Sequence, residues 1–235
     1  MQAELLGWYA ENGRDLPWRR TRDPYAILVS EVMLQQTQAA RVVPRYLEWL
    51  ERWPSAEALA GAPTAEVLRA WQGLGYNRRA LNLQRAARAV SAGGWPDDLI
   101  SLPGVGRYTA DAVACFAFGR PVLPVDVNVR RVLERTGSAF DYRCAQALMD
   151  LGATVCIARV PRCGECPLAA GCSSRGRRYE PLRKQGRFEG SFRQRRARAL
   201  RSVLDGLDPR DGEAVAALEA DGLVRIENGI VSPPG

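Results

Sequence analysis

Apolar residues recur every three to four positions along most of the chain, which is the spacing that places them on one face of a helix. With glycines, prolines and capping residues as breaks, this pattern predicts helices over residues 3–11, 26–38, 41–52, 55–60, 64–72, 77–91, 97–101, 107–118, 191–204 and 211–221. Alternation with a period of two occurs only in LVRIENGIVSP, where Asn228-Gly229 predicts a hairpin turn. We therefore predict an all-α main body, followed by a small winged-helix-like module of two helices and a hairpin.

A single carboxyl group interrupts the most apolar of these helices. Glu31 stands in AILVSEVMLQQ, with three apolar residues on either side. Burial would disfavour its charged form, so we expect Glu31 to have a raised pKa and to donate a proton near neutral pH. A structural role, as the cap of a neighbouring helix or the partner of an arginine, explains the residue equally well at this point.

Two glycines mark a tight turn between the helices at 97–101 and 107–118. In Leu102-Pro-Gly-Val-Gly106 the glycines allow positive φ, and the turn leads directly into a helix N-terminus. Backbone N–H groups at such a terminus suit a DNA phosphate without reading base sequence. The alternative is a plain corner between two helices.

A second carboxyl group precedes the next predicted helix. Asp126 comes just before Val127-Asn-Val-Arg-Arg-Val-Leu and is well placed to cap that helix. A helix N-terminus favours the ionised carboxylate, which is the opposite of the state expected for Glu31. Two carboxyl groups held in opposite states are typical of an acid and anion pair in a catalytic site.

Four of the six cysteines form the pattern C-x6-C-x2-C-x5-C: Cys156, Cys163, Cys166 and Cys172. Four thiolates within seventeen residues favour a metal centre over disulfides in a chain that we expect to be intracellular. We predict a [4Fe–4S] cluster, with a four-cysteine zinc site as the alternative. Cys115 and Cys144 lie in apolar helical segments and are expected to be ordinary buried thiols.

Composition agrees with a globular protein, since 46% of the 235 residues are apolar and 25% are charged. No apolar run approaches the ~18 residues that a membrane helix needs, and the N-terminus lacks the features of a signal peptide. We expect a bacterial, cytoplasmic, nucleoid-associated protein. Residues 175–201 hold eleven Lys and Arg against two Glu, a charge that suits DNA, although a solvated linker would also carry it.

Two scarce residue types narrow the chemistry further. The chain has no His, which excludes imidazole acid–base catalysis and every nucleophile activated by His. Lys184 is its single lysine, and it lies in the basic strip. The reaction must therefore use carboxylates, hydroxyls, amides, arginines or a cofactor.

Several separated motifs carry a resemblance to a known family: LPWR, DPYAILVSEVMLQQTQ, GLGY, LPGVGRYTA, VDVNVRRVL, ALMDLGATVC and the four-cysteine loop. Across about residues 5–175 the chain resembles the helix–hairpin–helix DNA glycosylases of the endonuclease III superfamily, most closely the MutY-type adenine DNA glycosylases. The resemblance implies two lobes, an iron–sulfur cluster domain (1–18 and 124–175) and a six-helix domain (19–123). A basic linker (176–189) and the C-terminal module (190–235) would follow.

The resemblance also implies a reaction, the hydrolysis of the N-glycosidic bond of adenine mispaired with 8-oxoguanine or guanine. Glu31 matches the general acid that protonates the adenine, and Asp126 matches the carboxylate that stabilises the cation-like sugar. Tyr108 matches a pocket residue of this branch, at the position where bifunctional relatives carry a lysine that forms a Schiff base. We therefore expect a monofunctional glycosylase that leaves an abasic site.

The expected partner is double-stranded DNA that contains a mismatch or an oxidised guanine, bound by a monomer with the target base flipped out of the duplex. Residues at matched motif positions imply these DNA contacts: Gln35, Gln36, Thr37, Leu74, Tyr76, Gly104, Val105, Gly106, Arg107 and Asn128.

The chain departs from the family pattern in several places. Asn77 replaces the second aromatic of GLGYY, and Val127 stands where glycine is usual. The run between Arg135 and Cys144 is short, so we expect a helix of the cluster domain to be missing or trimmed. Only about fifty residues follow the linker, where the family usually has a larger domain. Two alternatives therefore stay open: a thymine or uracil mismatch glycosylase of the same superfamily, and a non-catalytic protein that binds DNA structures.

Overall fold

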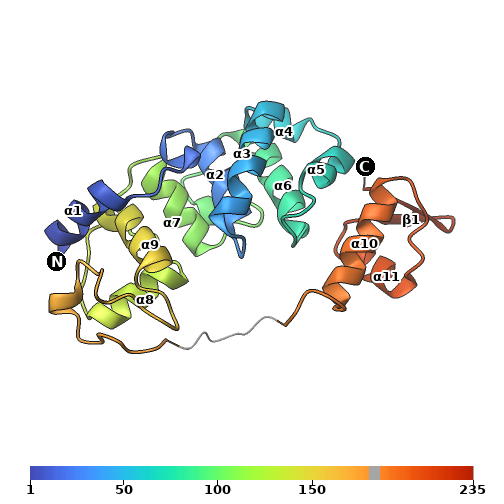
Figure 1. The fold of residues 1–235 in the computed structure, drawn as a ribbon. Helices are drawn as coiled ribbons and strands as arrows, with labels where there is room; N and C mark the ends of the chain where they lie inside the picture. The colour runs from blue at the N-terminus through green and yellow to red at the C-terminus, as the bar shows by residue number, and fades with distance from the viewer. Residues whose placement is uncertain (180–185, 235) are drawn as a thin grey trace. The chain divides into compact units, whose positions relative to one another are not determined.

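The computed structural model describes residues 1–179 and 186–234, and these are mostly helical. Contacts divide the chain into two compact units (Figure 1). The first unit comprises Met1–Pro24 and Gly106–Lys184, and the second comprises Tyr25–Val105 and Gln185–Gly235. Both units are thus built from two separate stretches of the chain.

The first unit brings the N-terminal helix together with helices that follow much later. Its helices and short 3-10 turns are α1 (Gln2–Asn12), η1 (Pro17–Arg19), α7 (Arg107–Phe116), α8 (Val127–Thr136), η3 (Tyr142–Cys144), α9 (Ala145–Thr154) and η4 (Ala169–Gly171). Leu5 of α1 is fully buried against Val129 and Val132 of α8 and Leu148 of α9. Apolar burial of this kind is the main force that holds α1 to the rest of the unit.

The second unit contains a run of helices from α2 to α6: α2 (Pro24–Leu34), α3 (Ala39–Arg52), α4 (Ala56–Ala60), α5 (Thr64–Ala70), α6 (Arg78–Gly93) and the 3-10 turn η2 (Leu99–Ser101). Helices α4 and α5 both pack against α6. Three tryptophans fill part of the core, with the Trp49 ring centroid 4.6 Å from that of Trp53 and 5.4 Å from that of Trp71. Their edge-on contacts are the arrangement that aromatic rings prefer.

The C-terminal elements also belong to the second unit. They are α10 (Phe192–Leu204), α11 (Gly212–Ala220) and the antiparallel strands β1 (Arg225–Glu227) and β2 (Ile230–Ser232). Asn228 and Gly229 both have positive φ, of 52° and 79°, as a tight two-residue hairpin turn requires. The predicted two helices and hairpin are therefore present, and Arg69 of α5 donates hydrogen bonds of 2.8 and 3.1 Å to the carbonyl of Leu204.

Most predicted helices occur within a few residues of their expected bounds, with some local differences. Helix α5 has Pro63 as its N-cap, and the hydroxyl of Thr64 in its first turn contacts Gln84 at 3.1 Å. Cys144 is buried as expected, but Cys115 is only partly buried. Within the described residues, the short run from Gly137 to Cys144 contains only the turn η3.

The units divide the chain after Pro24 and Val105, whereas the sequence-based division lay after residues 18 and 123. Residues 180–185 of the expected basic linker lie outside the described part of the chain. Of the helices that the structure describes, none is both long enough and apolar enough to cross a membrane.

Candidate active site

Helix α2 places Glu31 in an apolar interior. Every residue from Tyr25 to Met33 is buried, and Glu31 is 5% exposed. This is the apolar surrounding that the sequence pattern predicts for Glu31. The catalytic role of Glu31 stays a prediction.

Two segments that are expected to contact DNA lie next to each other in the second unit. Gln35–Thr37 follows α2 and Leu74–Tyr76 precedes α6, and both segments contact the guanidinium of Arg79. Gln36 and Tyr76 are exposed, whereas Leu74 is only 5% exposed. A contact from Leu74 to DNA would therefore use its backbone rather than its side chain.

The glycine turn has a steric requirement that involves α6. Gly104 has a φ of 75°, and a Cβ atom at this position would lie 2.5 Å from the Cβ of Asn82. Gly106 is the N-cap of α7 and provides no side-chain cap, while Arg107 is exposed and pairs with Asp111 at 3.1 Å. Val105 is buried, so any contact from Val105 to a phosphate would use its backbone.

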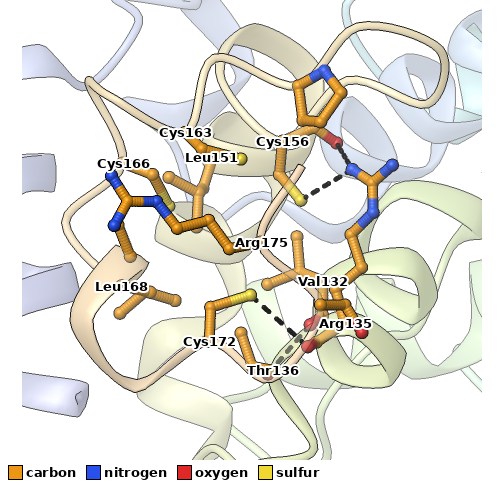
Figure 2. A pocket seen from close by; sticks show the side chains of 13 residues that line it. Val132, Arg135, Thr136, Leu151, Cys156, Cys163, Cys166, Leu168, Cys172 and Arg175 are labelled. Atoms are coloured by element: carbon orange, nitrogen blue, oxygen red, sulfur yellow. Dashed lines mark hydrogen bonds between the residues drawn. The ribbon is translucent and has the colours of Figure 1, made fainter. Parts of the chain in front are cut away.

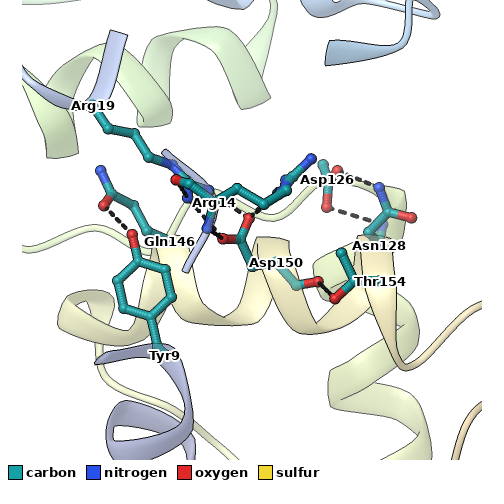
Figure 3. A network of polar contacts seen from close by, with 8 residues as sticks. All are labelled: Tyr9, Arg14, Arg19, Asp126, Asn128, Gln146, Asp150 and Thr154. Carbon is teal, nitrogen blue, oxygen red and sulfur yellow. Dashed lines mark hydrogen bonds and ion pairs between the residues drawn. The ribbon is translucent and has the colours of Figure 1, made fainter. Parts of the chain in front are cut away.

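Asp126 is the N-cap of α8, as its place in the sequence predicts (Figure 3). Its Oδ1 accepts hydrogen bonds from the backbone N–H groups of Asn128 at 2.9 Å and Val129 at 2.7 Å. Its Oδ2 accepts a bond of 3.0 Å from the side-chain amide of Asn128. Tyr108, in the first turn of α7, is partly buried and belongs to the same unit as Asp126.

A chain of polar contacts runs from Asp126 toward the cysteine loop. Asn128 accepts a hydrogen bond of 2.9 Å from Arg131, and the guanidinium of Arg131 also donates to the carbonyls of Gly152 at 2.6 Å and Cys156 at 2.7 Å. Burial lowers the pKa of Arg131, an effect that the nearby Cys156 partly opposes. Arg131 was not among the predicted site residues. Its place on the apolar side of α8 is nevertheless a sequence signal for a buried arginine that links neighbouring segments by hydrogen bonds.

A second buried network in the first unit centres on Asp150 of α9 (Figure 3). This carboxylate is fully buried and accepts hydrogen bonds of 2.6–2.8 Å from Arg14 and Arg19. Burial raises the pKa of Asp150, but the hydrogen bonds from Arg19 and Arg14 outweigh this and leave the pKa below its usual value. The network ties the segment after α1 to α9, and no pattern in the sequence predicts it.

The four cysteines of the predicted metal centre line one pocket (Figure 2). Arg135 donates to the Cys156 sulfur at 3.2 Å, and the Gly176 N–H donates to the Cys163 sulfur at 3.3 Å. Apolar side chains such as Val132, Leu151 and Leu168 form much of the remaining wall. Across residues 1–179 and 186–234, no three Cys, His, Asp or Glu side chains converge closely enough to hold a metal ion. The cysteines share a pocket without meeting at one point.

Known proteins resemble this chain in sequence over most of its length. It is 45% identical to the adenine DNA glycosylase of Mycolicibacterium smegmatis, over 88% of this chain and 81% of that protein. The adenine DNA glycosylase of Mycobacterium tuberculosis is 46% identical over 83% and 76%, and the human one is 40% identical over 81% and 42%.

Solved structures resemble the fold. A thermostable thymine-DNA glycosylase matches 73% of this chain and 93% of its own, with a TM-score of 0.66 and 31% identity. A trapped covalent intermediate of endonuclease III with DNA matches with a TM-score of 0.63 and 25% identity, over 74% of this chain and 92% of its own. The family described as HhH-GPD superfamily base excision DNA repair protein matches residues 29–148. The chain belongs to this HhH-GPD superfamily.

Proposed function

We propose that this protein is an adenine DNA glycosylase of base excision repair, acting on adenine mispaired with 8-oxoguanine or guanine. The observation that carries the proposal is the 45% identity to an adenine DNA glycosylase over more than four fifths of both chains. The surroundings of each carboxyl group that the reaction needs, taken separately, support it. Glu31 is buried in apolar α2, and Asp126 caps α8.

In the proposed reaction, Glu31 donates a proton to a ring nitrogen of adenine. The bond between that base and C1′ of the sugar then breaks, and its electron pair leaves with the base. Asp126 stabilises the positive charge that develops on the sugar, and water adds at C1′ and loses a proton. Tyr108 lines the pocket for the base.

We further propose that the enzyme is monofunctional. Cleavage of the DNA strand through a Schiff base needs an amine nucleophile, and position 108 holds tyrosine. The only lysine, Lys184, lies outside the described residues. If the protein nicked abasic DNA as fast as it excised adenine and became trapped on DNA by borohydride, this part of the proposal would be wrong.

We infer that Cys156, Cys163, Cys166 and Cys172 hold a [4Fe–4S] cluster. Their shared, largely apolar pocket and the N–H groups directed at two of the sulfurs fit such a group. When bound, the cluster would supply iron–thiolate bonds that hold the loop together. About four iron atoms per chain in anaerobically prepared protein would support it, and one zinc ion per chain would overturn it.

We propose the domain organisation that the sequence predicts. It consists of an iron–sulfur cluster domain (1–18 and 124–175), a six-helix domain (19–123), a basic linker (176–189) and a winged-helix-like module (190–235). Helices α10 and α11 and the β1–β2 hairpin are the elements that support this proposal. We propose that the protein acts as a monomer on chromosomal DNA in the bacterial cytoplasm.

A single-turnover assay tests the function directly. Duplexes carry adenine opposite 8-oxoguanine, adenine opposite guanine, or thymine or uracil opposite guanine, and alkali reveals each abasic site. We expect adenine to be released fastest. The 31% identity to a thymine-DNA glycosylase favours thymine or uracil excision as the second candidate, and faster release of either base would establish it instead. Duplex binding without excision of any base would favour a non-catalytic role.

A further inference from the structure

The guanidinium of Arg79 donates hydrogen bonds to both segments that are expected to contact DNA, residues 35–37 and residues 74–76. Its Nη1 donates to the carbonyls of Val32 at 2.7 Å, Met33 at 3.2 Å and Gln35 at 2.6 Å. Its Nη2 donates to the carbonyls of Leu74 and Gly75, each at 3.0 Å, and approaches the Thr37 hydroxyl at 3.4 Å. One side chain of α6 therefore joins the end of α2 to the loop that precedes α6.

The hydrogen bonds from Arg79 to α2 satisfy carbonyl groups at the C-terminal end of that helix. The last carbonyls of a helix have no partner within the helix, and the partial negative charge at this end attracts a cation. Helix α2 ends at Leu34, so Val32 and Met33 provide carbonyls of its last turn. Arg79 acts as the C-terminal cap of the helix that carries Glu31.

Two residues beside these contacts have an unfavourable backbone conformation. Gln36 and Tyr76 have φ values of 55° and 47°, in the left-handed region that residues other than glycine rarely adopt. In each case the carbonyl of the preceding residue accepts a hydrogen bond from Arg79, namely Gln35 and Gly75. A conformation of this kind persists only where its surroundings hold it in place.

Aromatic rings enclose the same guanidinium. It lies 5.3 Å from the ring centroid of Trp71 and 5.7 Å from that of Tyr76, close enough for cation–π attraction. The Trp71 indole N–H also donates to the Gly75 carbonyl at 3.0 Å. Burial lowers the pKa of Arg79 to about 10, and the nearby Tyr76 opposes this shift.

We propose that Arg79 is a positioning residue that locks Gln36 and Tyr76 in their left-handed conformations, so that the two exposed side chains enter the DNA as one rigid wedge. The proposal rests on the proposed function for its substrate, a mismatched duplex. Arg79 itself need not touch DNA, because its hydrogen bonds are directed at the protein backbone. Its effect is to hold both loops and the end of the Glu31 helix in one fixed arrangement.

The variants Arg79→Gln and Arg79→Lys test this role, with Arg88→Gln as the matched control. Arg88 is also on α6 but is exposed, and it donates to a single backbone carbonyl, that of Ala60, at 3.1 Å. A lysine keeps the charge but offers three donors from one nitrogen, so it cannot serve both loops as the forked guanidinium does. We expect Arg79→Lys to be intermediate and Arg88→Gln to behave as the wild type.

Two measurements separate this proposal from the proposed function. Hydrogen exchange of the free protein should be faster in Arg79→Gln by about tenfold or more in both residues 35–37 and residues 74–76. This readout does not depend on which base is excised. In a duplex with 2-aminopurine beside the mismatch, the fluorescence increase caused by the wild type should be largely lost, and single-turnover excision should slow by about tenfold or more.

The proposed function and the positioning role of Arg79 are overturned by different results. Failure of the wild type to release adenine would overturn the proposed function, while the exchange measurement would still test the role of Arg79. Unchanged exchange in either loop, or fluorescence and excision equal to those of Arg88→Gln, would overturn the positioning role. If circular dichroism shows that Arg79→Gln does not fold, Arg79→Lys is compared with Arg88→Gln in the same way, and equality between them would also overturn the proposal.

Discussion

Arg131 donates a hydrogen bond of 2.9 Å to the side-chain oxygen of Asn128. This bond fixes the orientation of the Asn128 amide, whose nitrogen then donates to Asp126 at 3.0 Å. We predict that Asn128→Ala slows single-turnover excision by about tenfold or more, since a hydrogen bond to a charged group contributes roughly 1.5–3 kcal/mol. The duplex affinity should change less than the rate.

The neighbouring residue provides a control for this prediction. Arg130 is exposed on the same turn of α8, and Arg130→Ala removes an even longer side chain without touching the chain of contacts. An equal loss of rate in both variants would mean that the Asn128 contact does not orient Asp126.

Replacement of Asp150 should destabilise the first unit strongly. Asp150→Asn leaves the guanidinium groups of Arg14 and Arg19 without their carboxylate, and Arg19 is only 11% exposed in this pair. Loss of one partner from a buried ion pair typically costs on the order of 3–5 kcal/mol. Urea unfolding should show this loss, whereas Asp15→Asn, which breaks an exposed pair with Arg20, should have little effect.

The same network predicts a dependence of stability on pH. The pKa of Asp150 is lowered in the folded protein from its ordinary value of 3.8, so its ionised form stabilises the fold. This contribution is complete well above pH 3.8 and is lost as the pH falls through the lower folded value. The difference in urea midpoint between wild type and Asp150→Asn should therefore be constant near neutral pH and shrink under acid conditions. A difference that grows in acid would contradict the assignment.

Gly104→Ala should weaken both folding and DNA binding. Alanine there is strained by the φ of 75°, and its Cβ would collide with Asn82 at 2.5 Å. Gly94 also has a φ of 75° but no atom within 4 Å of the added Cβ, so Gly94→Ala introduces a left-handed φ without a collision. We expect Gly104→Ala to lower the thermal midpoint more than Gly94→Ala, and only Gly104→Ala to weaken binding of an undamaged duplex. Equal effects would argue against a special role for this turn.

Glu31→Gln and Asp126→Asn should retain DNA binding but lose excision. Each change removes an ionisable group and keeps the shape of the side chain, and general acid catalysis typically contributes about 10²–10⁴-fold to a rate. Fluorescence anisotropy would report the affinity and single-turnover assays the rate. Excision at the wild-type rate by Glu31→Gln would assign this carboxyl a structural role instead.

Local patterns in the sequence predicted much of the fold. The cap at Asp126, the burial of Glu31 and the turn at Asn228-Gly229 each depend on neighbouring residues, and each is present. The buried networks of Asp150 and Arg79 were not predicted, because they join residues far apart in the sequence. Asp150 meets Arg14 across 136 positions, and Arg79 meets Val32 across 47, separations over which a periodic pattern carries no information.

The two-segment construction of the first unit has a consequence for synthesis of the chain. Leu5 is fully buried, and the core around it is completed only by residues as late as Leu168. At a translation rate of about 5–20 residues per second, α1 leaves the ribosome on the order of 10 s before those partners exist. With eleven residues it is also short for a helix that must persist alone. Helix α1 is thus among the last elements of the first unit to reach its folded environment, although it is the earliest of them in the sequence.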